Sequence, residues 1–364
     1  MRLFGPITAT VAAPASDLES PTGLSNNGLE RSLSAIPSRS DPQEGTPIAR
    51  RPMGVGDYTV TRCPTPALSV NGGPAHPRCA FTIDVEDWYQ STIDFDAPIG
   101  DRVLRNVARA CAALDEHGLK GTFFVQGRVA ETFPRLLQDL LAAGHEIQSH
   151  GYSHRPLFSM DRKALTTELE YAKKTVEDAC GVRVTAFRAP DFSIVRRNLW
   201  ALEVLAETGF EIDSSIFPMS MGRYGIAGWE IGPHRVALPG GREILEVPVA
   251  IATLAGMRVP VAGGGYIRLL PGPVLDMALR SVLASGRPAI LYCHPYEFSP
   301  EEMDEFRGSV GPAFRLTQGI GRSSFIRRVH HLLANLPFGR FDDVMAPWRA
   351  DAVDEGQTVA KRGR

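Results

Sequence analysis

Short apolar runs alternate with amphipathic helical stretches through most of this chain, and this alternation restricts the folds open to it. The predicted strands are 79–85, 121–125, 145–149, 184–190, 210–215, 243–249 and 289–295. The predicted helices are 103–114, 133–141, 161–181, 199–209, 273–285 and 325–336. Such alternation indicates an α/β fold with parallel strands covered by helices, arranged as an open doubly wound sheet or as a barrel. No GxGxxG motif follows the first strand, which disfavours a dinucleotide-binding fold.

The sequence on either side of the alternating region has a different composition. Residues 1–76 are rich in Pro, Ser, Gly, Asn and Arg without a persistent apolar period, so we predict a disordered extension there. Residues 77–298 are predicted to form the barrel domain, 299–348 a C-terminal extension that packs on it, and 349–364 a tail. No run of 18 apolar residues occurs, so no transmembrane segment is expected.

Charge and cysteine content narrow the classes of partner and compartment. The formal net charge of -2 offers no overall basic field, so no nucleic-acid partner is expected. The five cysteines are odd in number and show no CxxC spacing, which disfavours a disulfide framework or a zinc knuckle. The first twenty residues make a poor secretion signal, because their short apolar stretch is interrupted by prolines. These features favour a cytoplasmic location, and a peripheral or exported location stays open as the alternative.

Ionisable side chains follow most of the predicted strands at their carboxyl ends. In strand order they are Asp84, Glu86 and Asp87, then His150 and His154, then Arg188, then Asp213, and finally His294. In a β/α barrel these ends meet on one face, where active sites are built. Five strands that each deliver such a group to one rim therefore predict a site.

Each of these residues also has a purely structural interpretation. The histidine pair could stabilise a turn, Asp84 and Glu86 could cap a helix, Arg188 could form a surface ion pair, Asp213 could support a turn, and His294 could be a buried core histidine. The set as a whole favours the functional interpretation. A carboxylate and two neutral imidazoles form a facial ligand set for zinc or a similar divalent ion. A second carboxylate and a further histidine could then supply base and acid for hydrolysis of an amide or ester.

Five motifs occur in an order that resembles a known family. They are "FTIDVED", "SHGYSH", "FRAPDFS", "GFEIDSS" and "LYCHP". Over roughly residues 80–346 the chain resembles the polysaccharide deacetylases of the nodulation-protein-B type, carbohydrate esterase family 4. The segments "PVAGGGYIRLLP" and "HPYEF" resemble the branch found beside bacterial exosortase and exopolysaccharide loci. The resemblance implies a distorted (β/α) barrel of about seven strands.

The resemblance also implies a role for each ionisable residue. Asp84 would be the general base, His150 and His154 metal ligands, Arg188 the residue that orients and tunes Asp84, His294 the general acid, and Asp213 a candidate to orient His294. A backbone N–H near Asp191 or Phe192 would help to hold the oxyanion. The implied cofactor is a divalent metal, zinc in the first instance, with cobalt or another divalent ion as alternatives.

The first motif departs from the common family pattern in the residue that would complete the metal site. The usual motif has two adjacent aspartates, but here Val85 follows Asp84. We favour Glu86 as the ligand, because a step of two residues returns a side chain to the same side of a strand. Asp87 stays open as the alternative, since a bend at the strand end would reverse that argument.

The implied activity is metal-dependent removal of N-acetyl groups from a bacterial polysaccharide or its lipid-linked oligosaccharide precursor. Trp88, Tyr152, Phe192 and Tyr266 are candidate surfaces for stacking against the sugar, and three glycines precede Tyr266. Two alternatives remain open. The chain could be a metal-free hydrolase of small amides that cleaves C–N bonds on the same fold, or a catalytically inactive barrel that binds carbohydrate.

Overall fold

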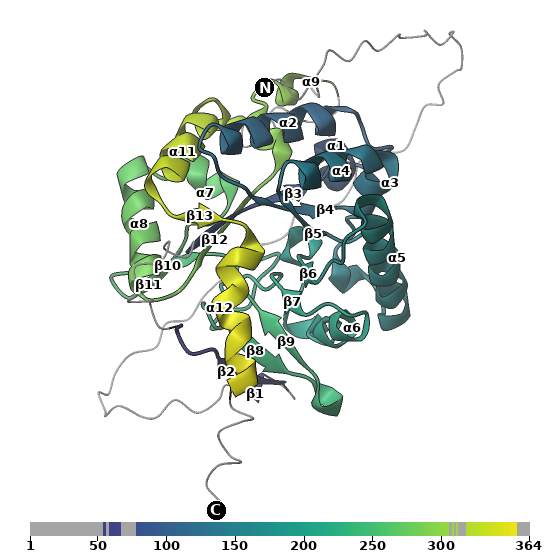
Figure 1. Cartoon of the computed structure of the whole chain (residues 1–364), viewed down its shortest axis with the longest axis vertical. Coiled ribbons are helices and arrows are strands. Elements are labelled where there is room, and N and C mark those ends of the chain that lie inside the picture. Colours follow the sequence, from purple (N-terminus) through teal and green to yellow (C-terminus); the bar gives the residue numbers. More distant parts are fainter. Residues whose placement is uncertain are drawn as a thin grey trace, which may run out of the picture. The chain divides into compact units, whose positions relative to one another are not determined.

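A curved row of parallel strands forms the centre of the protein (Figure 1). The computed structural model describes residues 54–55, 58–66, 78–305, 308, 311 and 318–354. The parallel strands are β3 (Cys79–Val85), β4 (Thr122–Val125), β5 (Glu146–Ser149), β6 (Ala186–Phe187), β7 (Ile212–Asp213), β9 (Glu243–Glu246) and β12 (Ala289–Cys293). They pair in the order β9–β7–β6–β5–β4–β3–β12. Each lies within a predicted strand, and the parallel direction is confirmed.

The two ends of this row are joined through the chain that follows β9. The amide of Ala250 donates to the carbonyl of Ile290 at 2.9 Å, and the amide of Tyr292 donates to the carbonyl of Ala262 at 3.0 Å. A parallel bridge between Gly263 and Tyr292 lies beside them. These contacts close the row into a distorted barrel, so the barrel and not the open sheet is the correct prediction.

Helices surround the strands (Figure 1). The longer ones are α2 (Arg102–Asp115), α4 (Pro134–Ala142), α5 (Arg162–Cys180), α6 (Ala201–Glu207), α8 (Gly272–Ala284) and α11 (Arg322–Asn335). Helix α5 begins and ends where the sequence predicts: the Asp161 carboxylate accepts from the amide of Ala164, and Gly181 takes a left-handed conformation with φ of 74°. Among the described residues, no helix combines the length and the apolarity needed to cross a membrane.

Successive residues of β3 face opposite sides of the barrel wall. Phe81, Ile83 and Val85 pack in the outer core beneath the helices, whereas Ala80 faces the interior. The interior cluster also contains Phe124, Ala186, Ile212, Leu245, Val247 and Ile290. Helix α12 (Phe341–Asp354) contributes four further side chains to this cluster: Phe341, Val344, Met345 and Trp348.

Helix α12 covers the end of the barrel where the strands begin. The amide of Phe341 donates to the Thr122 hydroxyl at 2.7 Å, and the amide of Asp342 donates to the Glu146 carboxylate at 3.0 Å. Both acceptors lie at the first residue of their strands. The opposite end, where the strands finish, is therefore the end available for a site.

The aromatic ring of Phe341 should be a main contributor to the stability of this closed end. It is fully buried and makes an edge contact with Phe124, with ring centroids 5.8 Å apart. We expect Phe341→Ala to lower the free energy of unfolding by about 3–5 kcal/mol, because a buried cavity replaces the ring. Denaturant titration measures this. The exposed Ala346 on the same helix provides the control, since Ala346→Ser should change the same quantity by less than about 0.5 kcal/mol.

Two predicted boundaries are wrong. Strand β2 (Tyr58–Arg62) lies inside the predicted extension 1–76, yet it pairs with β8 (His234–Ala237), which in turn pairs with β9. A five-residue edge strand within a Pro-rich stretch has too weak a pattern to be recognised, and its partner is remote in the sequence. Helix α12 continues past residue 348 into the predicted tail. The remainder of 1–76 and residues 355–364 lie outside the described residues.

The predicted C-terminal extension is integrated more closely than packing on the barrel requires. Strand β13 (Phe338–Gly339) pairs in parallel with β3 at Cys79 and Ala80, and α12 follows it directly. The extension thus adds a strand to the sheet and covers one end of the barrel. Other short elements are β1 (Gly54–Val55), the hairpin β10 (Ile251–Leu254) and β11 (Met257–Pro260), α1 (Trp88–Thr92), α3 (Gly127–Thr132) and α7 (Gly264–Leu269).

Candidate active site

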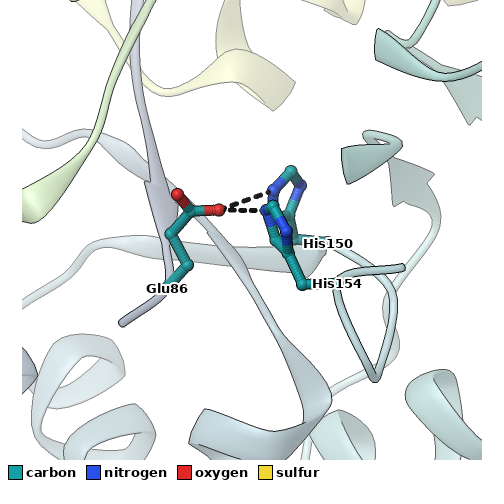
Figure 2. A group of neighbouring side chains, drawn as sticks. All are labelled: Glu86, His150 and His154. Carbon is teal, nitrogen blue, oxygen red and sulfur yellow. Dashed lines mark ion pairs between the residues drawn. The ribbon is translucent and has the colours of Figure 1, made fainter. Parts of the chain in front are cut away.

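Glu86, His150 and His154 converge at the open end of the barrel (Figure 2). Each offers one ligand atom, and the three atoms lie within 4.8 Å of one another. Glu86 Oε2 lies 3.5 Å from His150 Nε2 and is in contact with His154 Nε2. All three residues are buried. Among the described residues this is the one His, Cys, Asp or Glu cluster with metal-binding geometry.

Neighbouring groups orient these ligand atoms. Ser91 Oγ and the Tyr296 hydroxyl donate to Glu86 Oε1 at 3.1 and 3.2 Å, which leaves Oε2 facing the histidines. His150 Nδ1 lies 2.9 Å from the carbonyl oxygen of Arg188. Because a carbonyl can only accept, Nδ1 carries the proton and Nε2 presents its lone pair toward Glu86.

The loop between the two histidines depends on backbone conformation and on one remote glutamate. Gly151 and His154 both have positive φ, at 72° and 65°. Glu168 of α5 accepts from the amides of Tyr152 and Ser153 at 3.0 and 2.7 Å. Sequence reasoning did not identify Glu168, since nothing on an amphipathic helix distinguishes it from other acidic residues.

Asp87 belongs to the local fold. Its Oδ1 accepts from the amide of Tyr89 at 2.9 Å, which makes Asp87 the N-cap of α1. Its Oδ2 accepts from the amide of Gly100 at 2.8 Å. Both oxygens are therefore engaged away from the histidines, and the geometry favours Glu86 over Asp87 as the third ligand.

Asp84 and Arg188 form a buried ion pair inside the barrel. Asp84 Oδ1 lies 2.8 Å from Arg188 Nη1, and neither side chain is exposed to any extent. Arg188 also donates to the hydroxyls of Thr82 at 2.6 Å and Ser214 at 3.1 Å, and its guanidinium lies over the ring of Phe124. A planar cation held from several sides can fix one rotamer of Asp84.

His294 approaches the same site from the other side of β3. Its Nε2 lies 3.9 Å from Glu86 Oε1, and its ring stacks on Tyr296 with centroids 4.9 Å apart. Burial by itself would lower the pKa of His294, but the charges of Glu86 and Glu297 outweigh it and raise the pKa to about 9. Burial would likewise raise the pKa of Glu86, but His154 and His294 hold that pKa well below its ordinary value.

Asp213 does not orient His294, so that prediction is wrong. Its neighbour Ser214 reaches Arg188 inside the barrel, and alternation along the strand therefore turns Asp213 to the outer side of the wall. There Asp213 lies opposite Glu246, its partner across β7 and β9, and its carboxyl group accepts from the Ser215 hydroxyl. Burial raises the pKa of Asp213 to about 6 and that of Glu246 well above its ordinary value.

This buried carboxyl pair should make stability fall as pH rises. Both pKa values are raised on folding, so the native state retains protons that the unfolded chain releases above about pH 4. The free energy of unfolding should decline from there through pH 6 and beyond, by up to about 1.4 kcal/mol per pH unit for each proton. Glu246→Gln should flatten this decline, because the amide imitates the protonated acid and still accepts from the amide of Ile216.

Denaturant titrations at pH 5 and pH 8 measure the effect. Glu211→Gln removes the same charge from an exposed position of the preceding segment and should keep the wild-type slope. Equal slopes for Glu246→Gln and the wild type would contradict a shared proton.

The predicted sugar-stacking residues differ in accessibility. Trp88 is only 1 % exposed and packs with Tyr296, so it has no free ring face, and Phe192 is buried among Phe217, Tyr224 and Tyr292. The Tyr152 hydroxyl donates to Glu131 at 2.7 Å, and its ring packs against Tyr171. Tyr152 and Tyr266 are both half-buried, so of the four these two keep an accessible part.

Comparison with known families places this site in context. The model of the family described as polysaccharide deacetylase matches residues 92–212. The chain thus contains a polysaccharide deacetylase domain. A second model, described as a domain of unknown function (DUF3473), matches residues 214–346. The boundary between the two falls inside the barrel, at β7, so strands from both matched regions contribute to one fold.

Curated relatives match less than half of this chain. The chain is 35 % identical over 151 residues to chitin deacetylase 1 of Cryptococcus neoformans, and this match covers 37 % of this chain and 30 % of the relative. It is 30 % identical over 140 residues to a chitooligosaccharide deacetylase of Sinorhizobium fredii, and this match covers 38 % of this chain and 56 % of the relative. The matches thus span less than two thirds of either relative.

A solved structure matches nearly the whole fold. It is a candidate polysaccharide deacetylase from Mycobacterium smegmatis, with a TM-score of 0.50 and 22 % identity, covering 80 % of this chain and 96 % of that chain. At this identity the likeness supports the barrel architecture alone.

Proposed function

We propose that the protein is a metal-dependent deacetylase that hydrolyses N-acetyl groups on a polysaccharide or on its lipid-linked oligosaccharide precursor. One observation carries the proposal: the Glu86, His150 and His154 cluster lies at the same barrel end as the Asp84–Arg188 pair and His294. The polysaccharide deacetylase match at residues 92–212 and relatives named as chitin and chitooligosaccharide deacetylases support it.

The ligand set suits a divalent cation, and we propose zinc. Two imidazole nitrogens and one carboxylate oxygen form the cluster, which is a donor set that zinc accepts while keeping positions open for other ligands. A divalent ion held there would supply Lewis acidity, lowering the pKa of water and polarising a carbonyl group. Nickel, cobalt or iron also bind such donors, so metal analysis must accompany the assay.

The other residues would move protons. Asp84, held by Arg188, takes the proton of the attacking water, and His294 Nε2 donates a proton to the nitrogen of the breaking C–N bond. Acetate and the free amine of the sugar are the products. The amide of Phe192 already donates to the carbonyl of Ala189, so the amide of Asp191 is the better candidate to stabilise the oxyanion.

The substrate class and the location of the protein are inferred from features of the sequence outside the cluster. The resemblance of "PVAGGGYIRLLP" and "HPYEF" to the exopolysaccharide-associated branch supports a bacterial exopolysaccharide or its precursor. The odd number of cysteines and the lack of a CxxC spacing support action in a reducing compartment, the cytoplasm.

Acetate release from a panel of N-acetylated glycans tests the proposal. The panel should include chitooligosaccharides, peptidoglycan fragments and lipid-linked oligosaccharides, each assayed with metal-loaded and chelator-treated protein. We expect release from at least one glycan class, its loss after chelation and its return with zinc or cobalt. Release that survives complete metal removal would contradict the metal-dependent mechanism, and no release from any glycan would contradict the activity.

A further inference from the structure

The segment after β12 contains a buried carboxylate against the ring of His294. Glu297 Oε2 lies 3.5 Å from His294 Nδ1, and the same oxygen accepts from the backbone amide of His294 at 3.1 Å. Glu297 is 3 % exposed. The two ring nitrogens of His294 thus face different groups, since Nδ1 faces Glu297 while Nε2 faces Glu86.

Glu297 is itself held in place by two features of α7. The Arg268 guanidinium lies 3.2 Å from Glu297 Oε1, the oxygen that does not face His294. Gly264 lies so close that a Cβ atom there would be 1.8 Å from Glu297 Oε2. The neighbouring Gly263 leaves similar room for Tyr292. The run of glycines before Tyr266 therefore makes space for the side chains that surround His294.

We propose that Glu297 is the positioning residue of His294. Its carboxylate accepts from Nδ1 and thereby directs Nε2 toward the Glu86 cluster, while stacking on Tyr296 fixes the plane of the ring. A histidine whose Nδ1 is bound by a carboxylate keeps one tautomer and one ring orientation. This assignment replaces Asp213, which lies on the outer side of the barrel wall. It rests on the proposed function, in which His294 is the proton donor.

Two pairs of alanine substitutions, each with a test and a control, distinguish a positioning role of Glu297 from a general effect on stability. Glu297→Ala removes the carboxylate, whereas Glu302→Ala removes another fully buried glutamate a few residues along, one that binds Asn106. Gly264→Ala should displace the Glu297 carboxylate, whereas Gly265→Ala places its Cβ no closer than 3.9 Å to Arg268. Neither glycine has positive φ, so alanine is compatible with both backbones.

Steady-state acetate release gives the first readout. We expect Glu297→Ala and Gly264→Ala to lower kcat by about 10- to 100-fold with little change in KM, because positioning acts on proton transfer more than on binding. Glu302→Ala and Gly265→Ala should keep wild-type kcat. Glu297→Gln retains an acceptor oxygen and should recover most of the lost kcat. Equal kcat for the two members of each pair would overturn the proposal.

The second readout does not require activity. In protein labelled with nitrogen-15 at histidine, the Nδ1 proton of His294 should give a resolved downfield signal, assigned through its absence in His294→Gln. That signal should be lost in Glu297→Ala and Gly264→Ala and kept in both controls. Its persistence without Glu297 would overturn the positioning role even if the wild type releases no acetate, so failure of this inference is distinguishable from failure of the proposed function.

Discussion

Replacing Asp84 by asparagine should reduce acetate release by about 10²–10⁴-fold, the usual contribution of a positioned general base. Asparagine has nearly the same shape and its oxygen can still accept from Arg188, so the buried contact survives while the ability to take a proton is lost. We expect kcat to fall while the affinity for the glycan stays near that of the wild type. Initial rates together with glycan binding to the same protein measure both quantities.

Asp87→Asn is the matched control for this experiment. It makes the same chemical change three residues along, at the N-cap of α1, where asparagine caps as well as aspartate does. Its turnover should stay close to that of the wild type. Metal content should be equal in wild type, Asp84→Asn and Asp87→Asn, because neither aspartate belongs to the ligand cluster. Unchanged turnover in Asp84→Asn would exclude its role as the base.

Loss of the Glu86 carboxylate should have the largest effect on metal binding. Glu86→Ala removes one of three ligand atoms, and we expect zinc affinity to fall by more than about 100-fold, since removal of outer partners alone costs about 10–100-fold. Acetate release should fall with it. Calorimetric titration of chelator-stripped protein with zinc measures the affinity, and elemental analysis of the purified protein gives the occupancy.

Asp87→Ala distinguishes the two carboxylates that the sequence leaves as alternatives. It should retain zinc affinity but lower the free energy of unfolding by about 0.5–2 kcal/mol, because the N-cap of α1 is lost. The opposite result, with zinc binding lost in Asp87→Ala and kept in Glu86→Ala, would show that the loop rearranges on metal binding and that Asp87 completes the site.

The predictable part of this protein follows from short-range patterns. The seven runs from 79–85 to 289–295 all contain observed parallel strands, because buried strands and amphipathic helices leave their period in the local sequence. The position of ionisable residues at the ends of those strands was enough to predict which of them share one end of the barrel. They are Asp84, Glu86, His150, His154, Arg188 and His294. The step of two residues from Asp84 also favoured Glu86 over Asp87, and Glu86 is the residue in the cluster.

The partners of these residues could not be predicted in the same way. Glu168 and Glu246 lie beside a loop and a carboxyl group on elements that are remote in the sequence. Glu297 is only three residues from His294, but it reaches the ring because the chain turns directly after β12. The prediction that Asp213 orients His294 was wrong. It followed from the position of Asp213 in its motif, whereas alternation along the strand turns Asp213 to the outer side of the wall. Strand β2 and helix α12, which covers the end of the barrel where the strands begin, likewise depend on contacts with remote residues.

The sequence by itself determined the α/β class, limited the architecture to an open sheet or a barrel, and placed a set of ionisable residues at the strand ends, since periodicity and position along a strand are local properties. Only the tertiary structure decided that the row of strands closes into a barrel and that Glu86 faces the histidines while Asp87 caps a helix. It also decided that Glu297 lies against His294 while Asp213 lies opposite Glu246. The physical reason is that hydrogen bonds and ion pairs depend on separations of a few ångströms between side chains, and chain folding alone determines which remote carboxylates come that close.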